Sequence, residues 1–328
     1  MIQTFLRSIA PEPAKRMIRV WRHRGAVPEI QKLSIKAMGV DDHEFPWVEL
    51  ENGLKFYGFF PTKEQRILFK SIKDKISNVE EDYFAVVMEI ISRYIVPRSL
   101  PGETVYNPSK YIPLRDPLND FTLDTSQRKE LADRFHPQEG AVFVDVGAFL
   151  GYGTMRIAEQ VGKKGRVIAF EADPEILHIL KKNIECNGFD NIEIVPKAVG
   201  KEIGEYCFFR KEGTVNSLNA YVLKNLGYKD LSEIKVAVVP VDDALAELDV
   251  KQVDHVNITV NGGEHDAIIG MRKTLHKFKP TITLAGWYYV NKDQKVCDIV
   301  GPYLKSVGYK VLVGKLGRVL AWEARNGK

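Results

Sequence analysis

Phe143-Val144-Asp145-Val146-Gly147-Ala148-Phe149-Leu150-Gly151-Tyr152-Gly153-Thr154 is the stretch of this sequence that decides the fold. It begins with a short apolar run typical of a buried strand, passes through a glycine-rich turn, and continues with helical spacing. Glycines in such a turn let the backbone approach a ligand closely. In an open α/β sheet, the turn between the first strand and the first helix lies at the ligand-binding edge. We therefore expect a ligand site here.

The spacing of the glycines separates this turn from a dinucleotide site. A dinucleotide fingerprint reads G-x-G-x-x-G and directs helix amides at a pyrophosphate, whereas Gly147, Gly151 and Gly153 give G-x-x-x-G-x-G. Asp145 lies just before the first glycine, and an acid suits a cationic ligand better than a diphosphate. S-adenosylmethionine carries an ammonium and a sulfonium and has no phosphate, so it fits this pattern.

A second acid ends the next predicted strand. Glu171 closes that strand, and a carboxylate there can accept hydrogen bonds from both ribose hydroxyls of a nucleoside. Taken alone, an acid at a strand end is more often a cap or turn residue. Asp145 and Glu171 at consecutive strand ends, with the glycines between them, together indicate an adenosine-bearing ligand.

Strands and helices alternate along the chain after Gly140. The predicted strands cover residues 142–146, 166–171, 192–196, 206–209, 236–241, 254–260, 281–285, 309–314 and 318–323, and the predicted helices 125–135, 152–161, 174–187, 264–278 and 293–307. Apolar strands that alternate with helices form a parallel sheet covered on both faces. We expect a three-layer, Rossmann-like α/β fold with a seven-stranded, mostly parallel sheet that ends in an antiparallel hairpin.

A smaller α+β region, residues 1–124, is expected to precede the ligand-binding domain of residues 125–328. Asn52-Gly53 predicts a β-hairpin within residues 45–61, and residues 64–76 and 79–95 have helical spacing. Residues 1–24 are basic and amphipathic, which fits either peripheral contact with an anionic membrane or packing on the protein's own surface. The sequence does not assign this region a role, and we expect it either to contact the acceptor or to cover the cofactor.

Composition excludes several classes of protein. The 328 residues are 45% hydrophobic and 27% charged, which excludes wholesale disorder, and the net charge of +4 is too small to demand nucleic acid as a partner. The three cysteines are far apart, so no disulfide framework or metal site is expected. Because no apolar run is long enough for a membrane helix or a signal peptide, we expect a cytoplasmic protein.

Residues 140–285 resemble the FkbM-type methyltransferases, within the class I S-adenosylmethionine-dependent superfamily. The resemblance lies in residues 143–154, 165–174, 180–188, 195–200 and 241–245. It implies S-adenosylmethionine as cofactor and methylation of a hydroxyl oxygen on a small-molecule, sugar or lipid-linked acceptor. The implied cofactor-binding residues follow the first three strands: Asp145, Gly147, Ala148, Phe149, Gly151, Tyr152, Glu171, Ala172, Asp173, Lys197 and Ala198.

The acceptor side departs from the family pattern. Where the family reads close to K-I-D-V-E-G-x-E, this chain has Thr259 and Asn261 in place of the first two acids, and Ala285 where the next strand usually ends in an acid. Three explanations stay open: an acceptor that needs less help from a base, a metal absent where relatives bind one, or a non-catalytic cofactor-binding scaffold.

Two residues remain as candidate general bases, Glu264 and His265. The structural alternatives are a first-turn acid that complements the helix dipole for Glu264 and an ordinary helix residue for His265. Aromatic residues 287–289 could form an acceptor platform or cap the core. Residues 216–219 could reach the acceptor or form an ordinary polar loop.

Overall fold

The computed structural model describes residues 35–43, 45–50, 53–58, 117–211 and 215–324. The chain divides into two compact units, and the described part of the first is a small antiparallel sheet. Its strands are β1 (Ile35–Val40), β2 (Pro46–Leu50) and β3 (Lys55–Tyr57). The predicted hairpin is confirmed by the pairing of β2 with β3, while β1 was not predicted. The predicted helices of residues 64–76 and 79–95 and the basic residues 1–24 lie outside the described residues.

The described part of the second unit begins with η3 (Pro117–Asp120), ahead of the predicted domain start at residue 125. Leu118 and Phe121 pack with Leu131 and Phe135 of α6 (Thr125–Phe135), which explains why these residues belong to this unit. Asp124 caps α6 through a capping box with Gln127.

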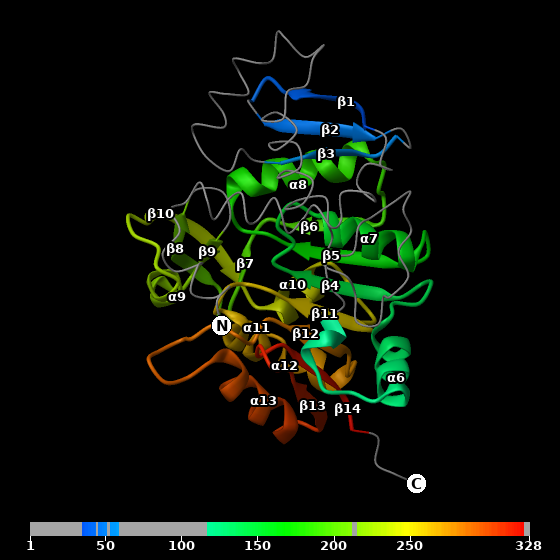
Figure 1. The fold of residues 1–328 in the computed structure, drawn as a ribbon, viewed down its shortest axis with the longest axis vertical. Helices are drawn as coiled ribbons and strands as arrows, with labels where there is room; N and C mark the ends of the chain where they lie inside the picture. The colour runs from blue at the N-terminus through cyan, green and yellow to red at the C-terminus, as the bar shows by residue number, and fades with distance from the viewer. Residues whose placement is uncertain (1–34, 44, 51–52, 59–116, 212–214, 325–328) are drawn as a thin grey trace, which may run out of the picture. The chain divides into compact units, whose positions relative to one another are not determined.

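A seven-stranded sheet forms the centre of this unit, as predicted (Figure 1). Its spatial order is β13 (Tyr309–Val313), β14 (Val319–Glu323), β12 (Thr281–Leu284), β11 (His255–Ile258), β4 (Val142–Val146), β5 (Arg166–Phe170) and β6 (Ile192–Val195). The five strands from β12 to β6 are parallel, and β14 runs antiparallel to both of its neighbours. The order reverses between β4 and β11, which is where ligands bind in such sheets.

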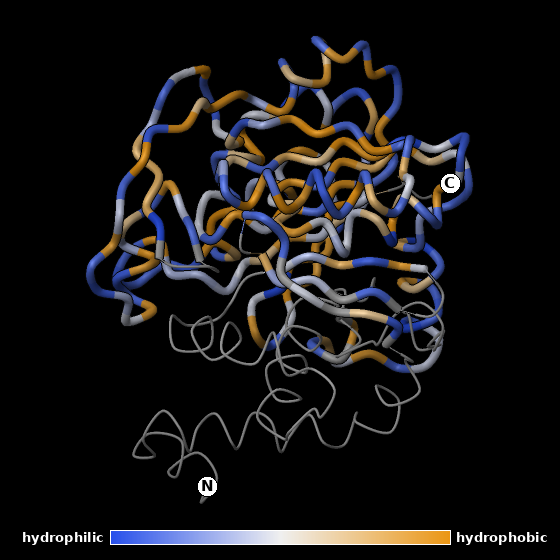
Figure 2. Tube along the Cα trace, turned by 90° about the horizontal axis from the view of Figure 1, so that it is seen from above, coloured by the Kyte–Doolittle hydropathy of each residue, from blue (hydrophilic) through white to orange (hydrophobic). Residues whose placement is uncertain are grey.

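Helices cover both faces of this sheet. On one face, α7 (Tyr152–Val161) packs on Phe143 and Val167. On the other face, Val144, Ile168 and Val256 lie in the large core together with four helices. These are α10 (Val241–Glu247), α11 (Glu264–Ile269), α12 (Arg272–Lys277) and α13 (Val296–Ser306). Side chains that alternate across each strand therefore divide between the two layers. Figure 2 shows hydrophobic stretches in the middle of the described trace. Among the described helices, none has the length and apolar character needed to cross a membrane.

The prediction of one helix over residues 264–278 is wrong, because the segment forms α11 and α12 with a break at Gly270 and Met271. A Cβ at Gly270 would lie 2.2 Å from the carbonyl oxygen of Gly200, so the chain passes another backbone here. Asp242 of α10 then caps α12 by accepting hydrogen bonds from the amides of Lys273 and Thr274. This cap comes from a distant part of the sequence, so the local pattern did not reveal it.

A second sheet lies beside the central one, between β6 and β11 in sequence (Figure 1). Its order is β7 (Ala198–Val199), β10 (Ser232–Val239), β8 (Gly204–Lys211) and β9 (Val215–Ser217), and α9 (Ala220–Asn225) follows β9. We call this group the insertion sheet. It brings Asn216 and Ser217, expected in a loop, into a strand, and the contacts of these two residues with the central sheet are described below.

Candidate cofactor and acceptor site

The predicted turn after β4 brings the backbone close to the neighbouring strand. Gly147 has φ +88°, and a Cβ there would lie 2.1 Å from the carbonyl oxygen of Thr259, so only glycine fits. The amides of Gly147 and Ala148 both donate to the carbonyl oxygen of Phe170, and the amide of Phe149 donates to Glu171. Because these three amides bond within the protein, they form no phosphate cradle, in agreement with a ligand that lacks phosphate.

Asp145 is buried at the carboxyl end of β4, with both carboxylate oxygens engaged. Oδ2 accepts a hydrogen bond from Thr154 Oγ1 at 2.7 Å, and Oδ1 accepts one from Asn257 Nδ2 at 2.9 Å. Thr154 belongs to α7 and Asn257 to β11, so this acid joins the first helix to the neighbouring strand. Any contact with a ligand ammonium would use the remaining lone pairs of the same oxygens.

Glu171 follows β5 and lies next to the glycine turn. Oε1 accepts from the amides of Ala172 and Asp173, and Oε2 accepts from the amide of Phe149 at 3.0 Å. Burial outweighs these bonds and raises the pKa of Glu171 to about 7. A carboxylate offers about four acceptor positions, so these contacts leave room for one ribose hydroxyl on Oε2 rather than for two on a fully open carboxylate.

Asp173 is a structural link rather than an open ligand group. Its Oδ1 accepts from the amides of Glu175 and Ile176, which caps α8 (Pro174–Cys186). Its Oδ2 is 2.6 Å from Arg210 Nε and accepts from Asn216 Nδ2 at 2.7 Å. Asp173 thereby holds the insertion sheet against the nucleoside side of the predicted site.

The predicted adenine contacts separate into two groups. Ala172 and Ala198 share one hydrophobic cluster with Phe208, Val236 and Val238 of the insertion sheet. The apolar character of this cluster suits a flat base next to it. Lys197 is different, because its Nζ lies 3.7 Å from Glu247 Oε2, toward α10. The remaining predicted residues, Gly151 and Tyr152, lie at the start of α7, where Gly151 is the N-cap and Tyr152 is buried.

Glu264, one of the two candidate bases, is fully buried at the start of α11. Oε1 accepts from the amide of Val260 at 3.0 Å, and Oε2 accepts from the amide of Gly262 at 2.8 Å. Burial raises the pKa of Glu264 to about 7. The carboxylate lies in the first turn of α11, as the structural alternative expected, and it also closes its own loop, residues 259–264, which was not expected. His265 is partly exposed, and its Nδ1 lies 3.4 Å from Asp266 Oδ1.

Asn261, which stands where the family pattern has an acid, is the centre of a neutral hydrogen-bond network. Its Nδ2 donates to the carbonyl oxygen of Asn216 at 2.8 Å, and its Oδ1 accepts from Tyr288 Oη at 2.7 Å. Its carbonyl oxygen accepts from Ser217 Oγ at 2.7 Å. A carboxylate could not make this set of contacts, because it has no proton to donate to Asn216. Asn261 thus joins the loop after β11 to the insertion sheet and to the segment after β12, a function that the sequence pattern did not reveal.

The three aromatic residues after β12, residues 287–289, each contact a different residue. Tyr288 bonds to Asn261, Trp287 packs against Arg318 at 5.3 Å, and Tyr289 is exposed beside Lys295. Ala285, where the family pattern has an acid, is buried, and its amide donates to the carbonyl oxygen of Ile258. In the described parts of the chain, no group of three or more His, Cys, Asp or Glu residues is arranged to hold a metal ion.

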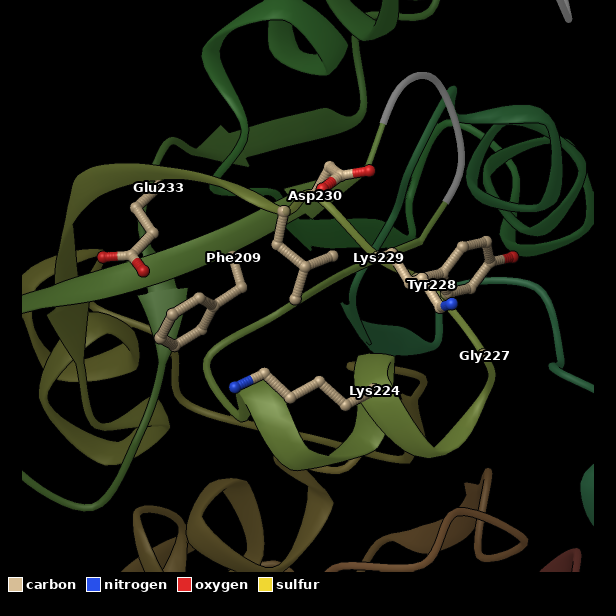
Figure 3. Close-up of a pocket in the computed structure, with 8 residues that line it drawn as sticks. Phe209, Lys224, Gly227, Tyr228, Lys229, Asp230 and Glu233 are labelled. Atoms are coloured by element: carbon tan, nitrogen blue, oxygen red, sulfur yellow. The ribbon is translucent and has the colours of Figure 1, made fainter.

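A pocket of about 510 Å³ lies elsewhere on the insertion sheet (Figure 3). Phe209 of β8, Lys224 of α9 and Glu233 of β10 line it together with residues 227–231. Figure 3 shows the side chains of Phe209 and Lys224 facing the same space. None of the predicted site residues lines this pocket, so it is separate from the predicted cofactor site.

Comparisons with known proteins support the sequence resemblance. Residues 145–311, about half of the chain, match the Methyltransferase FkbM domain family. The chain is 26% identical over 135 residues to protein-L-isoaspartate O-methyltransferase 1 of Archaeoglobus fulgidus, covering 40% of this chain and 59% of that protein. It is 39% identical over 56 residues to a probable cobalt-precorrin-6B C(15)-methyltransferase of Sulfolobus acidocaldarius, covering 17% and 29%. The chain thus spans less than two thirds of the length of either relative.

A solved structure of methyltransferase FkbM from Methylobacillus flagellatus aligns with 74% of this chain and 52% of its own, at 15% identity and a TM-score of 0.41. Family membership rests on the family match of residues 145–311 and not on this structural alignment. The matched residues include the glycine turn and both strand-end acids. The chain belongs to the FkbM methyltransferase domain family, and S-adenosylmethionine is its cofactor.

Proposed function

We propose that this protein transfers the methyl group of S-adenosylmethionine to a hydroxyl oxygen of a small-molecule, sugar or lipid-linked acceptor. The observation that carries the proposal is the paired carboxyl ends of β4 and β5. There Asp145, Glu171 and the Gly147 turn lie together, next to the reversal of strand order between β4 and β11. The sulfonium supplies an activated methyl group, and alignment of donor and acceptor supplies much of the rate in such a displacement.

In this proposal the protein holds the reactants more than it changes them chemically. Glu171 accepts a ribose hydroxyl, and Asp145 fixes α7 and β11 around the methionine end. The acceptor enters beside Asn261, Tyr288 and Thr259, where neutral groups can hydrogen-bond a hydroxyl. His265, which is partly exposed next to this loop, is the better-placed candidate to take the hydroxyl proton, because Glu264 is buried and engaged by backbone amides.

The alternative is a non-catalytic protein that binds S-adenosylmethionine within an assembly. The neutral residues at positions 259, 261 and 285 favour it, since none of them is a base near neutral pH. Both proposals require the same cofactor crevice, so binding alone does not separate them.

Turnover separates the two proposals. The protein would be incubated with S-adenosylmethionine and a fractionated extract of hydroxyl-bearing metabolites, and release of S-adenosylhomocysteine would be followed by mass spectrometry. A methyltransferase releases it with at least one fraction, and the His265→Ala variant releases at least tenfold less. Binding of S-adenosylhomocysteine without any turnover would favour the scaffold, and an unchanged rate in the variant would remove His265 from the mechanism.

A further inference from the structure

One buried acceptor beside the cofactor crevice has no partner in the described structure. The Oδ1 atom of Asn216 is shielded from solvent and receives no hydrogen bond from any described residue. Leaving a buried acceptor unpaired costs about 1–3 kcal/mol. A donor on a ligand that is enclosed between the loops around Asn216 would supply the missing partner.

The contacts of Asn216 place its Oδ1 atom between Asp173, on the nucleoside side of the site, and Asn261, on the acceptor side. Its Nδ2 donates to Asp173 Oδ2, and its carbonyl oxygen accepts from Asn261 Nδ2. The amide of Asp173 in turn donates to Glu171 Oε1, the carboxylate assigned to the ribose. The two atoms of one side-chain amide are close together, so Oδ1 lies within a few ångströms of the Asp173 carboxylate.

The residues around Asn216 indicate which donor of the cofactor would pair with Asn216 Oδ1. The ribose hydroxyls belong at Glu171, and the ammonium belongs at the far end of the turn near Asp145. The remaining donor of the cofactor is the exocyclic amine of adenine. Ala172, which precedes the Asn216 partner Asp173, packs with Ala198 in one hydrophobic cluster, so a base next to Asp173 would meet apolar side chains. Lys197, at the end of the third strand, cannot accept a hydrogen bond, and its ammonium pairs with Glu247.

We propose that Asn216 Oδ1 accepts a hydrogen bond from the exocyclic amine of the adenine and so selects the base of the cofactor. This inference rests on the proposed function, because it presumes that the nucleoside occupies the crevice next to Glu171. It gives the insertion sheet a role in cofactor recognition. The main-chain carbonyl oxygen of Asn216 also accepts a hydrogen bond from Asn261 in the loop after β11, so base recognition and the position of this loop meet at one residue.

The test compares two ligands that differ at this amine. S-adenosylhomocysteine and S-inosylhomocysteine, which has a carbonyl oxygen in place of the amine, would be titrated by calorimetry into the wild-type protein and the variant Asn216→Ala. The matched control is Asn225→Ala, which changes an exposed asparagine at the other end of α9. Thermal unfolding of each variant checks that it is folded.

The wild type and the control should bind the adenosyl ligand at least about tenfold more tightly than the inosyl ligand, because two carbonyl oxygens would face each other in the inosyl complex. In Asn216→Ala this ratio should fall to about twofold or less. If the variant does not fold, Asn216→Asp keeps an acceptor oxygen, and it should retain the discrimination although both ligands bind more weakly.

Two results would contradict the account in different ways. If both ligands bind and Asn216→Ala discriminates between them as well as the wild type does, Asn216 does not contact the base, while the proposed function stands. If the folded wild type binds neither ligand, the proposed function itself fails.

Discussion

The nucleoside side and the acceptor side of this crevice hold their loops with opposite kinds of groups. Around β4 and β5, the buried acids Asp145, Glu171 and Asp173 accept hydrogen bonds from amides, hydroxyls and side-chain amides. Around β11 and β12, the corresponding contacts centre on Asn261, with Tyr288 and Ser217 as partners. The difference teaches that a missing acid is not the same as a missing function, because a carboxamide both donates and accepts.

Glu264 is the exception on the acceptor side, and its removal should have the largest effect on stability. Glu264→Ala leaves the partly buried amide of Val260 and the buried amide of Gly262 without these acceptors, at about 1–3 kcal/mol each. We expect the free energy of unfolding to fall by roughly 4 kcal/mol in urea titrations, against less than about 0.5 kcal/mol for His265→Ala. Equal stability of the two variants would show that Glu264 does not close the loop.

The two buried glutamates, one on each side, should make stability depend on pH. Burial raises the pKa of Glu171 and of Glu264 to about 7 from the ordinary value of 4.5. Between these values the folded protein binds more protons than the unfolded chain, so the contribution of these groups to stability is greatest below pH 4.5 and is lost as the pH rises to about 7.

Each carboxyl should contribute roughly 3 kcal/mol to this change. Urea unfolding of the wild type, Glu264→Gln and Glu171→Gln between pH 4.5 and 8 would measure it. Each variant should have a shallower decline with pH than the wild type, and parallel curves for all three proteins would show that these carboxyls titrate normally.

Asn261→Asp introduces an acid at a position where the family pattern has glutamate, and it should break the neutral network. Aspartate tolerates the φ of +53° at this position as asparagine does, so the change isolates the hydrogen bond to Asn216. Above its pKa, the carboxylate would face the carbonyl oxygen of Asn216, with a cost of about 2 kcal/mol. Protonated, it can donate again, so the stability difference from wild type should shrink toward pH 4. A difference that is constant with pH would contradict this role.

Tyr288→Phe should have the smallest effect of these changes. It removes the partly buried hydrogen bond from Tyr288 Oη to Asn261 Oδ1 and keeps the ring, so we expect a loss of about 1 kcal/mol in thermal or urea unfolding. Binding of S-adenosylhomocysteine should be unchanged, because Tyr288 lies on the acceptor side. Weaker binding in this variant would mean that the two sides are not separate.

Local sequence pattern predicted the elements whose partners are close along the chain. The glycine turn, α7 and its strand, and the helix capped by Asp173 were predicted nearly residue by residue, because caps, glycines and apolar spacing are local signals. The helix break at Gly270 was missed, since its causes are Gly200 and Asp242. The short strand β1 was missed because its pairing with β2, not its own composition, makes it a strand.

The positions of the site residues were easier to predict than their contacts. Strand ends predicted where Asp145 and Glu171 lie, but no local rule indicates that Asp145 bonds to Asn257 across the sheet. The same holds for Asn261, whose partner Asn216 comes from the insertion sheet. Contacts that join residues far apart in sequence depend on how the loops pack, and a single sequence does not contain that signal.

The central claim is that the crevice at the ends of β4 and β5 binds S-adenosylmethionine. The most direct test is calorimetric titration of S-adenosylhomocysteine into the wild type, Glu171→Gln and the exposed control Glu185→Gln. We predict one site per chain, affinity reduced at least about tenfold in Glu171→Gln, and no change in Glu185→Gln. Equal binding in all three folded proteins, or no binding to the wild type, would contradict the assignment.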